Sequence, residues 1–448
     1  MSSLVIQNGR VIDPGSGSDR VTDLIIENGR ITGMRKVSSP AGAVLDASGC
    51  IVCPGLIDPQ VHLREPGEEE KETIASGAAA AINGGFTSVV CMANTHPDID
   101  DDARIEFVYK QAARANLCHV FPTGAVTKGR RGQELAEIAL MAQAGAVAFS
   151  DDGDCIASSD VMTKALGYVK MTNRPLLQHC EDPSLVTDGV MNAGILATQL
   201  GLTGRPSVAE LLMIQRDVLL NQGIGCRYHV QHLSTEGGVE LVRRARQDGE
   251  PVSAEVTPHH LLLTEDDCKG YDTRYKMNPP LRTRRDIHAL LEGVRDGTIT
   301  MLATDHAPHT REQKEQEFAI APAGILGLEC ALPLYIRALI ESETIDWPQM
   351  IMMMTLRPAQ LCGLVGKGTL AEGADGDVTV IDPNHSWTID VDRFASRSRN
   401  CPFHGWDVTG RVLATIVSGR TKLLRDPQRI RGTDAVPSEA NQLLPMAI

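Results

Sequence analysis

The sequence predicts an α/β protein: a (β/α)8 TIM barrel with a small β-sandwich domain built from both chain termini. The middle of the chain, residues 56–360, alternates short apolar runs with longer helical stretches. Both ends instead carry short apolar runs separated by turn residues. Strand followed by helix at a regular spacing is typical of parallel strands joined by helical crossovers. With 448 residues, of which 42% are hydrophobic, the chain can bury one large and one smaller core.

Residues 1–55 and 361–430 share one pattern. Near the start, runs such as SLVIQNG and DLIIENGRITGM are divided by Gly, Asn and Asp, which favour hairpin turns. Similar runs return as DGDVTVIDP at 375–383, SWTIDV at 386–391 and VLATIVSGR at 412–420. We therefore expect the two ends to form the β-sandwich domain together. Residues 431–448 are weakly periodic and are interpreted as a C-terminal extension without an assigned role.

In the middle segment, residues capable of chemistry follow the predicted strands. TSVVCMAN, for example, ends in Asn94 and is followed by the helical run ARIEFVYKQAARA. The other strand ends carry His62, Asp151, Asp152, His179, His232, His259, His260 and Asp305. A TIM barrel builds its active site at these strand ends. An open doubly wound sheet would do the same, but neither GxGxxG nor GxxxxGK[ST] follows a strand here, so the barrel is favoured.

Composition excludes several classes of function. A net charge of −14 and a pI near 5.4 argue against a nucleic-acid partner, which requires clustered Lys and Arg. The sequence has neither a signal-peptide pattern nor an apolar run long enough to span a membrane, so we expect a cytoplasmic protein with no membrane partner. The eleven cysteines are expected to be reduced, with Cys50 and Cys53 buried as structural residues. A small-molecule substrate fits this composition best.

Four of the strand-end residues form the candidate metal site. His62, His179, His232 and Asp305 each end a separate predicted strand, and the pair Asp151–Asp152 adds a carboxylate. Nitrogen and oxygen donors meeting in one barrel mouth suit Zn²⁺ or a similar divalent ion. His229 lies three residues before His232 and is interpreted as a packing residue. For His259 and His260, a structural role and a hydrogen bond to a metal ligand both stay open.

A series of motifs follows the predicted strands along the chain: HLREPG at 62–67, MANTHP at 92–97, FSDDG at 149–153, QHCED at 178–182, YHVQHLST at 228–235, TPHHLLLT at 257–264, KMNPPLR at 276–282, TDHAPH at 304–309 and APAGILGLE at 321–329. These motifs resemble those of bacterial dihydroorotases, metal-dependent members of the amidohydrolase superfamily. They cover almost the whole chain in family order, and HLREPG, MNPPLR and TDHAPH together are specific. The resemblance implies a TIM barrel, a small β-sandwich, and interconversion of N-carbamoyl-L-aspartate and L-dihydroorotate in pyrimidine (UMP) biosynthesis.

The resemblance also implies roles for individual residues. The implied metal ligands are His62, Asp152, His179, His232 and Asp305, with Asp151 as the alternative to Asp152 for the carboxylate that bridges two metals. The implied substrate-binding residues are His62, Arg64, Asn94, Asn278, His309 and the backbone at Ala323 and Gly324. Asp305 is the expected general base, which takes a proton from the attacking water and returns it to the departing amide nitrogen.

One position departs from the family pattern DxHxHxRE. Gln60 stands where the first histidine of that motif belongs. A neutral amide oxygen is a poor Zn²⁺ ligand compared with imidazole, so we expect the second metal to be weakened or missing. The cofactor is thus expected to be Zn²⁺, with one or two ions per chain left open.

Other functions and partners stay open. A different cyclic amidohydrolase, resembling allantoinase or dihydropyrimidinase, would share the metal chemistry, but Arg64, Asn94 and His309 suit a substrate that carries a carboxylate. A non-catalytic scaffold for aspartate transcarbamoylase is the second alternative. We expect a homo-oligomer, with aspartate transcarbamoylase as a candidate partner. The polar stretch 309–317 is interpreted either as a mobile lid or as a solvated loop.

Overall fold

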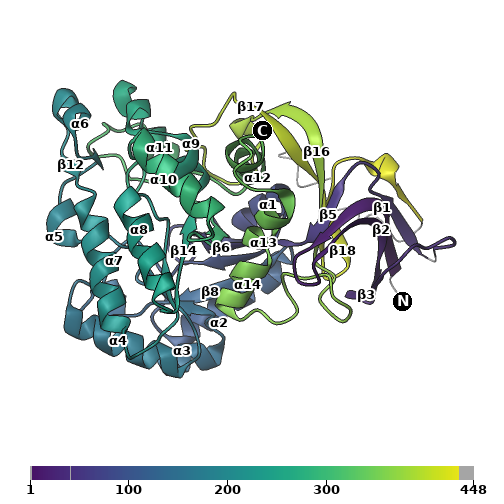
Figure 1. Cartoon of the computed structure of the whole chain (residues 1–448), viewed down its shortest axis with the longest axis horizontal. Helices are drawn as coiled ribbons and strands as arrows, with labels where there is room; N and C mark the ends of the chain where they lie inside the picture. The colour runs from purple at the N-terminus through teal and green to yellow at the C-terminus, as the bar shows by residue number, and fades with distance from the viewer. Residues whose placement is uncertain (1–2, 41, 433–448) are drawn as a thin grey trace.

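A computed structural model describes residues 3–40 and 42–432. It confirms the α/β barrel, with a second sheet beside it that is built from both ends of the chain (Figure 1). Beyond Gly432, the expected C-terminal extension lies outside the described residues. No helix among the described residues is both long and apolar enough to cross a membrane.

The barrel is a parallel sheet in which strands neighbour one another in chain order. Its eight described strands are β6 (Leu56–Val61), β7 (Phe86–Cys91), β8 (His119–Gly124), β9 (Ala148–Phe149), β10 (Leu176–Gln178), β13 (Tyr228–Val230), β14 (Val252–Val256) and β15 (Met301–Leu302). The main-chain N–H of His62 donates to the carbonyl of His306 over 2.9 Å, which brings the segment after β15 back to the end of β6. The sheet therefore closes, and its strand ends share one mouth.

Helices cover the outside of the barrel (Figure 1). The longer ones are α1 (Ile74–Gly84), α2 (Asp102–Ala115), α3 (Ile138–Ala144), α4 (Ser159–Met171), α7 (Val208–Asn221), α8 (Glu236–Gln247), α10 (Arg284–Arg295), α13 (Trp347–Met354) and α14 (Leu356–Cys362). Shorter ones are α5 (Pro183–Val186), α6 (Ile195–Leu200), α9 (Pro258–Leu262), α11 (Arg311–Lys314) and α12 (Ala331–Tyr335). Local sequence sets their ends: α1 begins at a capping box formed by Thr73 and Ser76 and ends at Gly85, whose φ of 90° favours glycine.

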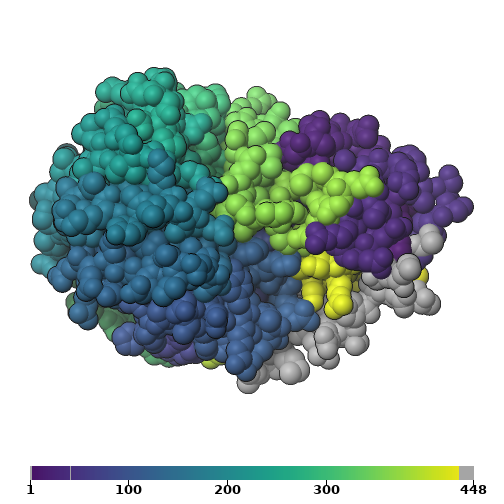
Figure 2. Space-filling view, turned by 90° about the horizontal axis from the view of Figure 1, so that it is seen from below, coloured from purple at the N-terminus to yellow at the C-terminus, as the bar shows by residue number. Residues whose placement is uncertain are grey.

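The second sheet joins the two chain ends. Its strands are β1 (Ser3–Asp13), β2 (Ser18–Glu27), β3 (Arg30–Met34), β4 (Ala43–Asp46), β5 (Ile51–Pro54), β16 (Val378–Thr388), β17 (Asp407–Val417), β18 (Arg420–Leu424) and β19 (Ile430–Arg431). The strand β16 pairs antiparallel with β5, so early and late segments become neighbours, as Figure 2 also shows on one face. The runs expected at 375–383 and 386–391 lie largely in the single strand β16. The division into domains at 55 and 361 stays an interpretation.

This terminal sheet packs on the barrel through both polar and apolar contacts. The hydroxyl of Thr379 donates to the Gly85 carbonyl over 2.6 Å, and that of Thr415 donates to the Ile82 carbonyl over 2.9 Å. Cys53 belongs to the apolar cluster shared with the barrel, whereas Cys50 belongs to the cluster of the terminal sheet. Both thiols are free and buried. The apolar core is thus continuous between the terminal sheet and the barrel. It stabilises the end of the barrel opposite the mouth and leaves the mouth open to ligands.

Candidate active site

A cavity of about 220 Å³ lies in the barrel mouth. Its walls are formed by His62, Arg64, Asn94, Asp152, Gly153, His179, His232, Met277, Asn278, Asp305, Ala307, His309 and Ala323. The metal-ligand and substrate-binding residues that the resemblance implies therefore line this cavity, except Gly324 and the alternative Asp151; His259 and His260 do not line it. The order of the strands explains the convergence, because His62 follows β6, His179 follows β10 and Asp305 lies just after β15.

Three donors in this cavity converge on one point. Nδ1 of His179 lies 2.9 Å from Nε2 of His232, and Oδ1 of Asp152 lies 3.7 Å and 3.5 Å from those two nitrogens. One ligand atom from each residue falls within 4.8 Å of the other two, and all three side chains are buried. Nδ1 of His232 has no hydrogen-bond partner among the described residues. Two imidazoles and a carboxylate in this arrangement fit a tetrahedral ion that accepts N and O ligands.

Asp305 and His62 complete the inner wall. Nε2 of His62 lies 2.9 Å from Oδ1 of Asp305 and 3.3 Å from Oδ2 of Asp152. Its other nitrogen, Nδ1, lies 2.8 Å from Oδ1 of Asn94. The imidazole is thus held at both nitrogens, and it joins the two carboxylates of the site.

The two aspartates of the FSDDG motif have different surroundings. Asp151 accepts hydrogen bonds from the N–H groups of Val126 and Thr127 over 2.8 Å and 3.1 Å, and from the Thr127 hydroxyl over 2.5 Å. Asp152 instead faces the histidines. Gly153 follows with a φ of 85°, a left-handed conformation that favours glycine. Asp151 therefore supports the loop, and the geometry favours Asp152 as the ligand.

Charge in the cluster is tightly balanced. Burial alone would lower the pKa of His179, but its hydrogen bonds to Asp152 and Glu181 outweigh burial and raise that pKa to about 10. Burial would likewise raise the pKa of Asp152, yet hydrogen bonds from His179 and His232 hold it well below its ordinary value. The Asp152 and Glu181 carboxylates thus favour positive charge in this part of the cavity, as expected of a cation site.

Gln60 points its amide into the same cluster. Its Nε2 donates to Oδ1 of Asp152 over 3.3 Å and to Oδ1 of Asp305 over 3.5 Å. Carboxylates accept hydrogen bonds, so they draw the NH₂ group toward them and turn the amide oxygen away. That oxygen is buried, and no group in the described part of the chain forms a hydrogen bond with it. In this orientation Gln60 donates hydrogen bonds to the two carboxylates. A histidine at this position would instead supply a ligand to a second ion.

Arg64 is the main positive charge on the outer wall. It is only 8% exposed, and burial lowers the pKa of its guanidinium. Its Nε donates to the Pro308 carbonyl over 3.2 Å, and Nη2 lies 3.4 Å from Nε2 of His309. Within the described residues it forms no ion pair with a carboxylate. A buried arginine without a protein anion is a ready partner for an anionic ligand.

The backbone at 322–324 closes the cavity on one side. The Ala323 carbonyl lies 2.8 Å from Nε2 of His309. Gly324 lies behind it, where its carbonyl accepts from Asn400 and Lys314 and its N–H donates to the Lys276 carbonyl. Both backbone groups of Gly324 are thus already engaged within the protein.

The stretch 309–317 contains a short, anchored helix. The helix α11 begins at a capping box between Thr310 and Gln313, and Lys314 is buried. Nζ of Lys314 donates to the carbonyls of Pro322 and Gly324 over 2.9 Å and 3.2 Å. This part of the stretch is therefore tied to the cavity wall; whether it moves as a lid stays a prediction.

Three residues of this site have a left-handed backbone conformation. Arg64, His232 and Asp305 have φ values of 59°, 32° and 46°, in the left-handed region that side chains other than glycine rarely adopt. Such conformations cost about 1 to 3 kcal/mol each and persist where the surroundings require them. Here they direct a guanidinium, an imidazole and a carboxylate into one cavity.

Sequence reasoning missed several residues that support the site. Glu181 lies two residues after His179, and its Oε2 is 3.2 Å from Nε2 of that histidine. An acidic residue at this spacing could have been recognised, because alternate residues point the same way along a strand. Arg205 and Asn400 come from segments without a strand-end pattern, and their roles follow only from the fold. His229, expected to pack, is buried against Ser253 and Glu255.

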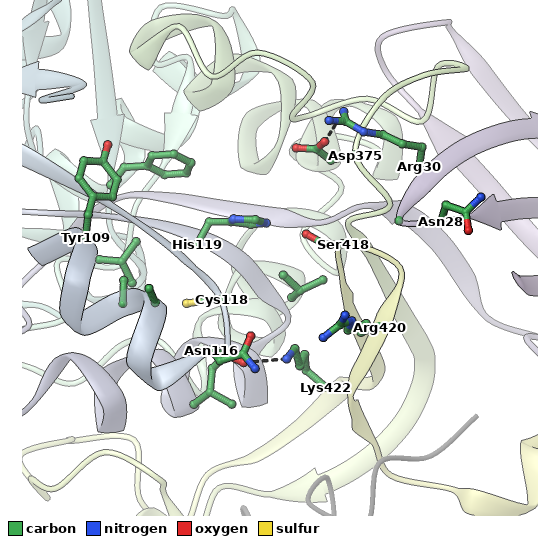
Figure 3. A pocket seen from close by; sticks show the side chains of 17 residues that line it. Asn28, Arg30, Tyr109, Asn116, Cys118, His119, Asp375, Ser418, Arg420 and Lys422 are labelled. Carbon is green, nitrogen blue, oxygen red and sulfur yellow. Dashed lines mark hydrogen bonds and ion pairs between the residues drawn. The ribbon is translucent and has the colours of Figure 1, made fainter. Parts of the chain in front are cut away.

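A larger cavity, of about 630 Å³, lies at the opposite end of the barrel. Figure 3 shows it between the helix α2, the start of β8 and the terminal sheet. Arg30 pairs there with Asp375, and Lys422 donates to the Asn116 carbonyl over 2.7 Å. None of the site residues expected from the sequence lines this cavity.

Comparison with known proteins places the chain among cyclic-amide hydrolases. Residues 49–237 match the Dihydro-orotase-like family model, and residues 282–422 match the Amidohydrolase family model. The chain is 47% identical to the dihydroorotase of Pelobacter propionicus, covering 93% of this chain and 99% of that protein. It is 49% identical to the dihydroorotase of Syntrophotalea carbinolica, and the match covers 93% of this chain and 98% of that protein.

Solved structures agree in fold. The L-hydantoinase of Arthrobacter aurescens superimposes with a TM-score of 0.82 at 25% identity, covering 94% of this chain and 96% of its own. The D-hydantoinase of Thermus sp. superimposes with a TM-score of 0.79 at 26% identity, and the match covers 96% of this chain and 97% of that one.

Proposed function

This chain belongs to the dihydroorotase family, and we propose that its barrel cavity interconverts N-carbamoyl-L-aspartate and L-dihydroorotate by reversible hydrolysis of a cyclic amide. The observation that carries the proposal is the buried, unpaired Arg64 in the same cavity as the cluster of Asp152, His179 and His232. Arg64 suits a substrate carboxylate, and the cluster suits the metal ion that a hydrolytic reaction of this kind requires.

We propose Asp152, His179 and His232 as the residues that hold one Zn²⁺, with His62 and Asp305 beside them. Such an ion would supply a Lewis acid for the amide carbonyl and would lower the pKa of a water molecule toward neutrality. The convergence of Nδ1 of His179 and Nε2 of His232 beside the Asp152 carboxylate supports the fit. Gln60 favours one ion per chain, since its NH₂ group already bonds to the carboxylates that would face a second.

The chain's own residues move the proton. Asp305 stands at the inner wall, with Oδ1 2.9 Å from Nε2 of His62, and is proposed to accept the proton of the attacking water. It then returns this proton to the amide nitrogen as the ring opens. His62 is held by Asn94 on its other side, so it keeps Asp305 aligned through both steps.

Arg64 is proposed to bind the substrate carboxylate together with Asn94 and His309. Its planar fork matches the two carboxylate oxygens, and burial strengthens that pairing by excluding water. Hydantoin and allantoin lack a carboxylate on the ring, so they would leave the guanidinium buried and unpaired. This argues against the hydantoinase-like alternative despite the shared fold. The intact donor set argues against a scaffold without a metal.

Substrate preference is tested by assaying the purified enzyme with L-dihydroorotate, hydantoin and allantoin. We expect the kcat/KM for dihydroorotate to exceed the others by about a hundredfold or more, which corresponds to about 2.7 kcal/mol for the carboxylate contact. Equal activity on hydantoin would refute the assignment of substrate.

Metal stoichiometry is tested by comparing the parent with Gln60→His by elemental analysis after zinc loading. We expect the parent to hold one zinc per chain and the variant to hold more. A parent that already holds two per chain would refute the single-ion proposal. Assembly as a homo-oligomer or with aspartate transcarbamoylase stays a prediction, which sedimentation of this protein alone and mixed with that enzyme would test.

A further inference from the structure

A continuous chain of side chains runs from the metal cluster to the outer cavity wall. Nε2 of His179 lies 3.2 Å from Oε2 of Glu181, and Nη1 of Arg205 donates to that same oxygen over 2.6 Å. The same Nη1 also donates to Oδ1 of Asn278. We propose that Arg205 is a positioning residue that fixes both Asn278 for the substrate and, through Glu181, His179 for the metal. This inference rests on the proposed function.

Arg205 is rigidly mounted for this role. It lies in β12 (Gly204–Arg205), which pairs with β11 (Met191–Asn192). Nη1 of Arg282 donates over 2.9 Å both to the Arg205 carbonyl and to Oδ1 of Asn192, so one guanidinium ties the two short strands together. Nε of Arg205 donates to the Gly189 carbonyl over 2.7 Å, and the side chain is only 18% exposed. Little rotational freedom remains to the guanidinium.

Arg205 decides which way the Asn278 amide faces. A guanidinium has donors only, so the amide must present its oxygen to Arg205 and its NH₂ group elsewhere. Asn278 lines the active-site cavity, and its Nδ2 makes no hydrogen bond within the described part of the chain. The cavity therefore offers a donor at this point. A carbonyl oxygen on the ligand, such as the ureido carbonyl of the proposed substrate, would satisfy it, whereas an N–H group would not.

On its other side, Arg205 acts on the metal cluster. The Glu181 carboxylate accepts from Nε2–H of His179, which leaves Nδ1 with its lone pair facing Asp152 and His232. Glu181 is almost fully buried, and the Arg205 guanidinium donates directly to its carboxylate over 2.6 Å. Nη2 of Arg282 is more distant, at 3.9 Å from Oε1. Loss of Arg205 would leave this carboxylate without its direct cationic partner.

The test compares Arg205→Met and Arg205→Lys with a matched control, Arg131→Met. Arg131 lines the neighbouring cavity of about 620 Å³ together with Arg205, but its side chain makes no hydrogen bond or ion pair among the described residues. Three quantities are measured for each zinc-loaded protein: kcat and KM for dihydroorotate, the rate of zinc loss to a chelator, and the midpoint of thermal unfolding.

We expect Arg205→Met to raise KM about tenfold with a smaller change in kcat, and to speed zinc loss about tenfold, the lower end of effects seen for groups that orient metal ligands. Arg205→Lys should recover part of both effects, because an ammonium still donates to Glu181 and Asn278 without the fixed fork. Arg131→Met should stay within twofold of the parent in all three measurements.

Parental KM and zinc retention in Arg205→Met would overturn the inference. So would equal losses in the Met and Lys variants accompanied by a large fall in the unfolding midpoint, because that pattern indicates a structural role. If the parent itself leaves dihydroorotate unchanged, the proposed function fails, whereas the zinc-release comparison still tests the link through Glu181.

Discussion

The cavity at the carboxyl ends of the barrel strands measures about 220 Å³, whereas the cavity at the opposite end measures about 630 Å³. In the larger one, Arg30 pairs with Asp375, Lys422 bonds to a carbonyl, and Arg420 is exposed to solvent (Figure 3). In the smaller one, Arg64 lacks a carboxylate partner within the described residues. The functional end of this barrel is therefore distinguished by buried polar groups that remain available to a ligand. The volume of the cavity does not distinguish it.

A buried acid near each end differs in the direction in which its pKa is shifted. Asp58 lies in the barrel interior beneath the site, and burial raises its pKa to about 8. Asp377 lies near the far cavity, where a hydrogen bond and charge from His119, together with the charge of Lys367, lower its pKa against the effect of burial. Asp58 therefore resists ionisation, whereas Asp377 is stabilised when ionised.

The largest expected effect is the loss of the general base. Asp305→Asn keeps the shape of the side chain but cannot accept the proton, so kcat should fall about a thousandfold. Asp375→Asn, at the opposite end, should leave kcat within about twofold of the parent. Steady-state assays with dihydroorotate measure both variants. Retention of a tenth or more of parental kcat by Asp305→Asn would mean that another group serves as base.

The next effect concerns the unpaired guanidinium. Arg64→Lys retains the charge but loses the bidentate fork, so KM should rise about tenfold to a hundredfold, or about 1.4 to 2.7 kcal/mol. The matched exchange Arg420→Lys in the far cavity should leave KM unchanged. An unchanged KM in Arg64→Lys would indicate that the substrate carboxylate binds elsewhere.

A third prediction uses the pH dependence of stability. Asp58 keeps its proton in the folded protein up to about pH 8 but loses it near its ordinary value of 3.8 when unfolded. The unfolded state thus binds fewer protons between these values, so Asp58 lowers stability progressively as pH rises from about 4 to 8. Asp58→Asn should therefore reduce the change in the free energy of unfolding between pH 4 and 8 by about a few kcal/mol. Denaturant unfolding at several pH values measures this free energy.

The opposite sign is expected for Asp377. Its lowered pKa means that the unfolded state binds more protons near pH 4, so its stabilisation is present above 3.8 and is lost as pH falls through the folded value. Asp377→Asn should therefore flatten the acid side of the stability profile, while Asp58→Asn flattens the range from about 4 to 8. The same slope change in both variants would contradict the opposite pKa shifts of Asp58 and Asp377.

The smallest effect is expected for the Arg30–Asp375 pair. The Arg30 side chain is 58% exposed, so solvent screens the interaction. Arg30→Gln should change the free energy of unfolding by less than about 1 kcal/mol and leave activity unaltered. Urea denaturation measures the first and a dihydroorotate assay the second. A larger loss of activity would assign a functional role to the far cavity.

The contrast also explains what sequence could predict. His62, His179, His232 and Asp305 were found because a regular strand-and-helix rhythm puts strand ends at one mouth. The sequence favoured Asp152 and kept Asp151 as the alternative, because both follow β9 within three residues. In the structure Asp151 accepts a hydrogen bond from Thr127, whereas Asp152 faces His179 and His232.

Other site features depend on distant segments. Arg205 reaches the site through a short pair of strands between α5 and α7, and Asn400 reaches Gly324 from a segment after β16. Neither carries a periodic or strand-end signal, because each is placed by tertiary packing. Gly324 was expected to contact substrate, but its N–H and carbonyl are hydrogen-bonded within the protein. Its proposed role stays a prediction.

The most direct measurement of the central claim is a calorimetric titration of metal-free protein with Zn²⁺, comparing His179→Asn in the mouth with His119→Asn in the far cavity. We predict stoichiometric binding by the parent and by His119→Asn, and at least about a hundredfold weaker binding by His179→Asn. Parental affinity in His179→Asn, or no zinc binding by the parent, would contradict a metal site at the carboxyl ends of the strands.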